Sequence, residues 1–216
     1  MRRLARSGAL RAQRFGRTLM FDPHDVDART RLLIHTGRTW APWTAWAALW
    51  ELSGERADWL DASTRSRLRA RLRACTADQL LAAVRGRAMR YDLAPSHNDQ
   101  NKLGAAWLVL SGQTAARLAG VYVSAERPAP RHSIEGYCVA SRLQETLGWF
   151  RLPLPHQPDR TMEVIVRVPR FDGLPLRPRH RMPVAVIGVD LAESRDAGVR
   201  QAGLKVLTDA LGALSR

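Results

Sequence analysis

The amino-terminal 40 residues constrain the fold most, because they are strongly basic and contain the pattern of a short β-hairpin. They hold nine arginines against three aspartates, a balance of +6 out of the chain's +14. Short polar and apolar runs on either side of Gly16-Arg17 predict two strands within residues 9–21. A hairpin is too small to bury a core by itself, so other residues must complete this unit.

Six arginines of this segment are candidate DNA contacts. The first three fit the last turns of a helix that Gly8 ends, since residues 2 and 6, or 3 and 6, share a helix face. The other three lie in the expected hairpin, where their guanidinium groups would contact phosphates or a minor groove. The affinity that such contacts add falls steeply with salt. A helix-start pattern follows at residues 22–28. The predicted contacts are Arg2, Arg3, Arg6, Arg11, Arg14 and Arg17.

The motif Leu4-x-x-x-Gly8-x-Leu10-x-Ala12-x-Arg14-x-Gly16-Arg17, followed by an apolar stretch and Asp25-Val26-x-Ala28, resembles the second half of an excisionase-like or MerR-like winged helix. The resemblance implies a DNA-binding regulator whose hairpin is the wing. The family's opening helix and the turn before its recognition helix are missing, so we expect completion by sequence upstream of Met1, by residues 29–90 or by a second subunit. The competing interpretation is a basic, partly disordered tail.

Residues 39–92 predict a helical connector. Pro42 suits the first turn of a helix, and Trp43, Trp46 and Trp50 follow at helical spacing as one apolar stripe. Such a stripe is typical of a core or of a helix–helix contact, which includes a dimer interface. The alternative is stacking on nucleic-acid bases.

The connector's second helix is expected to begin near Ser63-Thr64 and to bury Leu68 and Leu72. Its alternating arginines lie on several sides and form either a solvated face or a second contact with the DNA backbone, with candidate residues Arg65, Arg69 and Arg73. A third helix starts at the capping-box pattern Thr76-Ala77-Asp78-Gln79 and ends at Gly86.

Residues 93–216 predict a mixed α/β domain with about four or five strands, after a boundary near residues 92–102. An apolar segment at 105–110 is expected to be a buried strand or short helix. The remaining predicted strands are 134–139, 149–154, 163–168 and 184–191, and the predicted helices are 111–120, 141–148 and 197–214. The expected fold class is therefore α+β or α/β, with a winged-helix fragment at 1–38.

Three segments of residues 105–214 resemble the effector domain of AbiEi-like abortive-infection antitoxins. They are Ser111-Gly112-x-x-Ala115-Ala116-x-x-x-Gly120, Val166-x-Val168-Pro169 and Val189-Asp190-Leu191-Ala192-Glu193-Ser194-x-Asp196. In that family the winged helix binds the promoter of its own operon, and the neighbouring gene encodes a nucleotidyltransferase toxin. The resemblance implies a repressor that also serves as the antitoxin of a toxin–antitoxin pair, with double-stranded DNA and a toxin protein as partners. Winged-helix regulators commonly read repeated sites as dimers, so a homodimer is expected.

An enzymatic alternative uses the carboxylates Glu135, Asp190 and Glu193 to bind Mg²⁺ as a nucleotidyltransferase or nuclease. The chain has no nucleotidyltransferase signature, no GxxxxGK[ST] loop, no HExxH and no GxSxG. Asp190 is therefore expected to cap the following turn or to pair with an arginine, and we expect no enzyme and no cofactor. A third hypothesis is nonspecific binding of RNA or DNA through the arginines.

The composition excludes several further classes. The hydrophobic share of 45% is enough for a core, and there is no apolar run long enough for a membrane span or a signal peptide. We therefore expect a cytoplasmic protein. The six histidines are scattered, and Cys75 and Cys138 are isolated, which favours reduced packing cysteines and no metal site. Arginine is so abundant that its number alone carries little weight.

Overall fold

A computed structural model of the chain describes residues 12–15, 18–21, 38–93, 108–118, 134–149, 164–176, 181–194 and 196–215. Two compact units make up the chain, residues 1–37 and residues 38–216.

The first unit contains an antiparallel hairpin of β1 (Ala12–Phe15) and β2 (Thr18–Phe21). Phe15 pairs with Thr18, so only Gly16 and Arg17 connect the two strands. The hairpin predicted around Gly16-Arg17 is thus confirmed. The helices predicted on either side of it lie outside the described residues.

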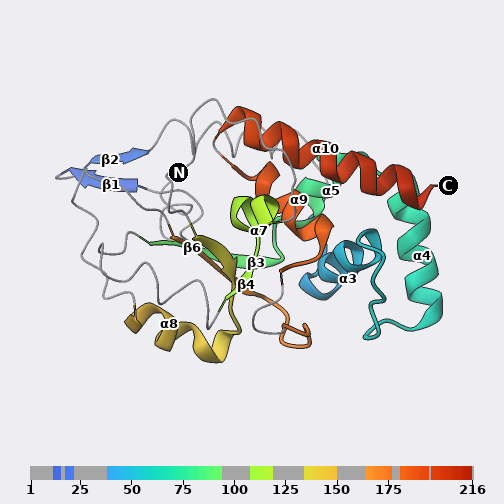
Figure 1. The fold of residues 1–216 in the computed structure, drawn as a ribbon, viewed down its shortest axis with the longest axis horizontal. Coiled ribbons are helices and arrows are strands. Elements are labelled where there is room, and N and C mark those ends of the chain that lie inside the picture. Colours follow the sequence, from blue (N-terminus) through green and yellow to red (C-terminus); the bar gives the residue numbers. More distant parts are fainter. Residues whose placement is uncertain are drawn as a thin grey trace. The chain divides into compact units, whose positions relative to one another are not determined.

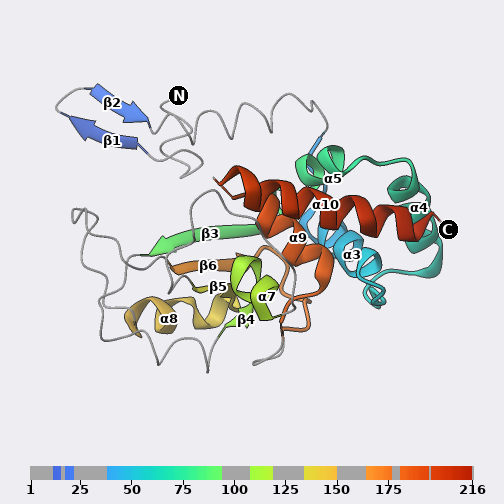
Figure 2. The ribbon, with the colours of Figure 1, turned by 45° about the horizontal axis from the view of Figure 1, so that its top comes forward.

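The described residues of the second unit form seven α-helices and a four-stranded sheet (Figures 1 and 2). The helices are α3 (Pro42–Leu52), α4 (Ala62–Arg73), α5 (Ala77–Val84), α7 (Gly112–Leu118), α8 (Leu143–Trp149), α9 (Val184–Ala192) and α10 (Ala197–Leu214), with a 3₁₀ turn η2 (Ala140–Arg142) before α8. The strands are β3 (Ala88–Leu93), β4 (Val109–Leu110), β5 (Ile134–Tyr137) and β6 (Val164–Pro169). The predicted mixed α and β class is confirmed.

The sheet has the strand order β3-β6-β5-β4. The central pair β5 and β6 is parallel, and the outer strands β3 and β4 are antiparallel to their neighbours. Figure 2 shows β3, β6 and β5 side by side, with α3, α4 and α5 gathered beside α9 and α10 at one end of the sheet. Segments far apart in the sequence therefore meet at the carboxyl end of β6.

The two faces of the sheet differ in polarity because successive side chains of a strand point to opposite faces. On one face Val164, Val166 and Val168 of β6 pack with Leu108 and Cys138 in an apolar cluster. On the other face β6 presents Arg167, and β5 presents Glu135 and Tyr137, all three buried. A charged side chain in the middle of a buried strand must find partners, and α9 supplies them.

Two helices of the connector begin at side-chain caps, α4 at Asp61, close to the expected start near Ser63-Thr64, and α5 at Thr76. The Asp61 carboxylate accepts a hydrogen bond from Thr64 N at 2.8 Å and starts α4, and the Thr76–Gln79 capping box starts α5 as expected. The α4 side that carries Leu68 and Leu72 is buried, which confirms that prediction.

The strand predicted at 184–191 is wrong, because this segment is helix α9. All of its residues after Val184 are buried, so its apolar run shows no periodicity that separates a strand from a fully buried helix. Pro183 at its N-cap ends the preceding extended segment. Helix α10, by contrast, spans the predicted residues 197–214.

Glycines let α9 and α10 pack closely. A Cβ on Gly203 of α10 would lie 2.3 Å from Ala192 N and 2.6 Å from Gly188 O. Any side chain at Gly203 would therefore separate the two helices. This close crossing holds the carboxyl end of α9 in place.

Two further predicted elements differ. Residues 88–93, the end of the predicted helical connector, form strand β3, in which apolar and polar residues alternate. Trp149 ends helix α8, whereas a strand was expected to start there, and residues 150–154 lie outside the described part. The unit 38–216 includes both of the segments that were expected to be separate, 39–92 and 93–216.

Strands β5 and β6 and helix α7 match the predictions for their segments. Cys138 is buried and Cys75 is partly buried, and both are free thiols. Burial raises the pKa of each thiol. In the part of the chain that the structure describes, no helix has the length and apolar character needed to cross a membrane.

Candidate functional site

The described strands of the hairpin contain one of the six arginines predicted to bind DNA. Arg14 lies in β1, where it pairs with Leu19 of β2. The other five, Arg2, Arg3, Arg6, Arg11 and Arg17, lie outside the described residues. The strand pair that the predicted wing requires is present, and the DNA contacts remain a prediction.

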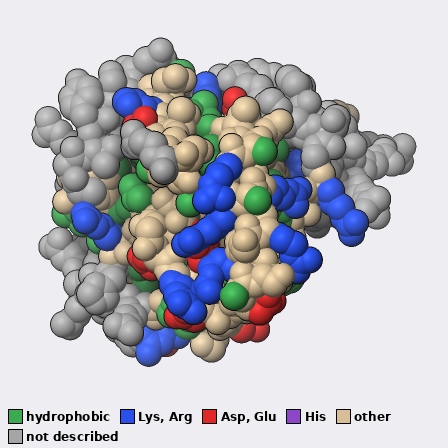
Figure 3. All heavy atoms as spheres, turned by 90° about the vertical axis from the view of Figure 1, so that its right-hand side faces the viewer, with side chains coloured by type: hydrophobic (Ala, Val, Ile, Leu, Met, Phe, Trp, Pro, Cys, Tyr) green, Lys and Arg blue, Asp and Glu red, His purple; other side chains and the backbone are tan. Residues whose placement is uncertain are grey.

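Arginines of α4 belong to a face of the protein on which Lys and Arg side chains gather (Figure 3). Two of the three candidate backbone contacts on α4 have partners within the protein. Arg69 Nε lies 2.6 Å from the buried Glu51 carboxylate, and Arg73 Nε donates to Leu214 O at 3.2 Å. The third, Arg65, has a buried Nη1 with no hydrogen-bond partner in the described structure. Arg69 and Arg73 therefore attach α4 to α3 and α10.

The tryptophan stripe of α3 divides into core and surface. Trp46 and Trp50 are buried and stack edge to face at 5.8 Å, as expected for a core. Trp43 is 43% exposed, so the core interpretation of the stripe is wrong for this residue. It lies in the first turn of α3, where its backbone oxygen accepts a hydrogen bond from Trp59 Nε1. The Trp46 ring also contacts Tyr137, which links α3 to the polar face of the sheet.

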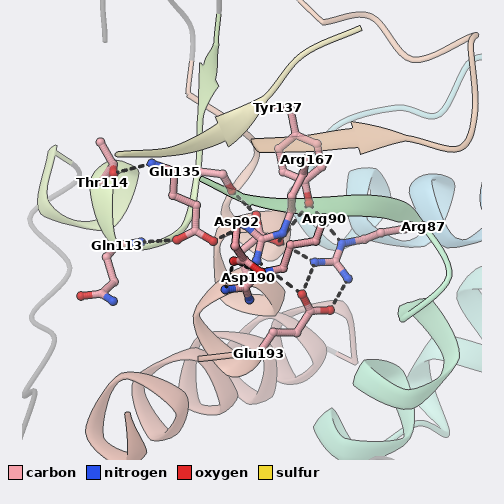
Figure 4. A network of polar contacts seen from close by, with 11 residues as sticks. Arg87, Arg90, Asp92, Gln113, Thr114, Glu135, Tyr137, Arg167, Asp190 and Glu193 are labelled. Atoms are coloured by element: carbon pink, nitrogen blue, oxygen red, sulfur yellow. Dashed lines mark hydrogen bonds and ion pairs between the residues drawn. The ribbon is translucent and has the colours of Figure 1, made fainter. Parts of the chain in front are cut away.

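A network of buried polar side chains lies between that face and α9 (Figure 4). Its members come from the α5–β3 junction, from β5 and β6, from the residue before α7, and from the carboxyl end of α9. They are Arg87, Ser111, Glu135, Tyr137, Arg167, Asp190 and Glu193. No other described part of the protein buries so many charged groups together.

Arg87 binds two carboxylates at once. Its Nη2 lies 2.5 Å from Asp190 Oδ1, and Nη1 and Nη2 lie 2.5 and 3.0 Å from the two oxygens of Glu193. Its Nε donates to Tyr137 Oη at 3.2 Å. The backbone oxygen of Arg87 accepts Trp46 Nε1 at 3.0 Å. The Arg87 side chain is 2% exposed. Through these hydrogen bonds, this one buried residue links α9, β5 and α3.

Arg167 contacts all three carboxylates of the network. Its Nη1 pairs with Glu135, its Nε lies 3.2 Å from Asp190 Oδ1, and its Nη2 lies 3.5 Å from Glu193 Oε2. Arg167 therefore joins β5 and α9 through the middle of the sheet.

Asp190 accepts hydrogen bonds from Arg87, Tyr137 and Ser111 and forms an ion pair with Arg167. Besides the two arginines, Tyr137 Oη donates to Oδ1 at 2.9 Å, and Ser111 Oγ donates to Oδ2 in a short hydrogen bond. Asp190 is thus the buried centre of the network, and its expected pairing with an arginine is confirmed.

The Glu135 carboxylate packs over Gly112, the first residue of α7. Gly112 has a φ of +52°, and a Cβ there would lie 1.6 Å from Glu135 Oε2. Gln113 N donates to the same oxygen at 3.3 Å. The position therefore requires glycine for two reasons, its backbone conformation and the space that the carboxylate occupies.

The pKa shifts follow from burial and from charge balance. Burial raises the pKa of Glu135, and Arg167 only partly offsets this. Burial also opposes ionisation of Glu193, but its ion pair with Arg87 prevails and lowers the pKa of Glu193 to about 2. Burial lowers the pKa of Arg87, yet Glu193 and the other acidic groups raise it overall. Arg87 is therefore charged at any ordinary pH.

The structure brings together the three residues of the enzymatic alternative, Glu135, Asp190 and Glu193. Each carboxylate is bound to at least one arginine, so its oxygens are already hydrogen-bonded. Among the described residues no group of three or more His, Cys, Asp or Glu side chains is arranged to hold a metal ion. The arrangement is suited to fixing α9 against the sheet, since a buried ion network is stable only when all its charges are paired.

Four members of the network were not predicted as site residues from the sequence: Arg87, Ser111, Tyr137 and Arg167. Arg167 carried a usable signal, because it interrupts the apolar run of β6, and a charge in a buried strand requires a partner. Arg87 could not be distinguished in the sequence from the many other arginines of the connector.

Comparisons with known proteins identify no relative: no family model, no curated protein and no solved structure matches the chain.

Proposed function

We propose that this protein is a sequence-specific DNA-binding transcriptional regulator, a repressor that contacts double-stranded DNA through its amino-terminal segment. The observation that carries the proposal is the β1–β2 hairpin, whose two-residue connection is Gly16-Arg17. A short hairpin among nine arginines combines the shape of a wing with the charge that binding to phosphates requires.

In this proposal the second unit is the part of the regulator that binds a partner. Its buried charges are paired with one another, so the proposal requires no catalytic residue. The resemblance of residues 105–214 to AbiEi-like antitoxins extends the proposal to an antitoxin that binds a nucleotidyltransferase toxin. The arginines of α4 are candidate additional contacts with the DNA backbone.

The test is binding to the DNA upstream of the protein's own gene, measured at several salt concentrations. The variant replaces Arg11, Arg14 and Arg17 together with alanine. The logarithmic salt dependence of the affinity should become shallower by about 0.9 for each phosphate that the variant no longer neutralises, thus by up to about 2.7. The matched control removes three exposed arginines of the second unit, Arg56, Arg142 and Arg170, and should leave the slope almost unchanged.

An unchanged affinity and slope in the hairpin variant would refute the wing assignment. Equal affinity of the unmodified protein for upstream and random DNA would instead support the nonspecific binder. The antitoxin role would be supported if a neighbouring gene encodes a nucleotidyltransferase and if that enzyme copurifies with the protein.

A further inference from the structure

Strand β3 is an outer strand of the sheet, and its far edge carries no strand in the described part of the chain. It pairs with β6 alone, over six positions. The other outer strand, β4, has only two residues. An edge of six residues is long enough to add another strand.

The hydrogen-bond pattern shows which backbone groups point to that edge. Arg170 N donates to Arg87 O at 2.8 Å, and the β3–β6 register extended by one position pairs these two residues. Residues of an antiparallel strand alternate in direction, so the odd-numbered residues of β3 bond to β6 and the even-numbered ones direct their N–H and C=O groups outward. Pro169, which has no N–H, lies opposite Ala88, as this pattern requires.

The outward positions include two opposite charges, Arg90 and Asp92. They lie on the same face of β3, and within one chain Arg90 Nη2 is 2.8 Å from Asp92 Oδ1 (Figure 4). Their side chains are 32% and 21% exposed.

We propose that β3 pairs in antiparallel fashion with β3 of a second copy of this chain, about a two-fold axis at Tyr91. In this register Arg90 of each copy lies directly opposite Asp92 of the other, at positions that exchange backbone hydrogen bonds. Two opposite-charge pairs then form across the interface. An axis at Arg90 or at Asp92 would place like charges opposite each other, so the charges select the Tyr91 register.

The opposite face of β3 is compatible with the same pairing. Tyr91 lies opposite its own copy, at a position where side chains come closest, and it packs against the apolar cluster of the sheet. Met89, which is 38% exposed, lies opposite Leu93 of the second copy. The described strands of the two copies then form a continuous eight-stranded sheet that ends at a short β4 strand on each side.

This pairing rests on the second unit alone and is independent of DNA binding. If both hold, the dimer carries two amino-terminal units, which suits a palindromic operator.

The experiment measures the mass of the full chain in solution across a range of concentrations, by light scattering and native mass spectrometry. The variants are Arg90→Asp, Asp92→Arg and the double exchange of both residues. Each single variant places like charges at both cross-strand pairs, which should raise the dissociation constant of the dimer at least about tenfold. The double exchange restores both pairs and should dimerise like the unmodified protein.

A mixture of the two single variants separates this interface from the ion pair within one chain. Within each single variant, residues 90 and 92 carry like charges and repel each other. When one chain with Arg90→Asp pairs with one chain with Asp92→Arg, however, both cross-strand positions hold opposite charges. We expect heterodimers in the mixture and few homodimers of either variant. A monomeric unmodified protein, dimerisation of both single variants at full strength, or a mixture without heterodimers would each overturn the proposal. Thermal unfolding confirms that each variant is folded, and if a single variant does not fold, dimerisation of the double exchange decides.

Discussion

Replacing Arg87 with methionine tests whether the buried ion network holds the second unit together. Methionine keeps an unbranched side chain but leaves Asp190 and Glu193 without the closest of their cations, 2.5 Å away. Removing one partner of a buried ion pair costs about 3–5 kcal/mol. Arg167 still lies 3.2 Å from Asp190 and 3.5 Å from Glu193, so we expect the lower end, about 3 kcal/mol.

The assay is urea unfolding followed by tryptophan fluorescence, since the core residue Trp46 bonds to the backbone oxygen of Arg87. Arg56→Met is the matched control, because Arg56 is 71% exposed and its pair with Asp58 should contribute at most about 1 kcal/mol. In a double-mutant cycle, Asp190→Asn should cost much less in the Arg87→Met background than in the unmodified protein. A loss below about 1 kcal/mol for Arg87→Met, or additive effects in the cycle, would refute the reasoning.

Two further predictions concern the same network. Gly112→Ala should destabilise the protein more than Gly54→Ala, measured by urea unfolding: both glycines have positive φ, which costs alanine about 1–2 kcal/mol, but only at Gly112 would the added Cβ displace Glu135. Equal losses would show that Glu135 moves aside freely. Glu193→Gln should destabilise the protein at neutral pH, and this difference should shrink as the pH falls from the usual pKa of the carboxyl, 4.5, toward its folded-state pKa of about 2. The sign follows because a lowered folded-state pKa stabilises the protein above the unfolded pKa and loses that effect on acidification. A difference that stays constant from pH 7 to pH 2 would contradict the assignment.

Local signals predicted much of this fold. The capping box at Thr76, the amphipathic period of residues 197–214 and the glycine-centred hairpin each depend on neighbours within a few residues, and the structure has all three. Strand β6 was also predictable, because Val164, Val166 and Val168 recur at every second position and therefore line one face of a strand.

Features that depend on distant residues could not be predicted in the same way. Residues 184–189 are apolar on every side of α9 because the helix is buried among its neighbours, and such a run fits a buried strand equally well. The network needed partners about 100 residues apart, as between Arg87 and Asp190. The carboxylates were identified from the sequence, and Arg167 could have been, but nothing in the sequence distinguished Arg87 or showed which arginine meets which carboxylate.

This separation along the chain also bears on how the protein folds during synthesis. Arg87 leaves the ribosome more than 100 residues before Asp190 and Glu193. Helices α3 to α5 and strand β3 therefore cannot reach their final packing before β6 and α9 are synthesised. Until then the Arg87 guanidinium, which is buried in the folded protein, remains exposed to water. Folding that depends on such remote contacts is slow relative to folding through local ones. Until β6 and α9 have been synthesised, the nascent chain consequently presents an unpaired β3 strand and an uncovered apolar helix face, the state in which chaperones bind and aggregation begins.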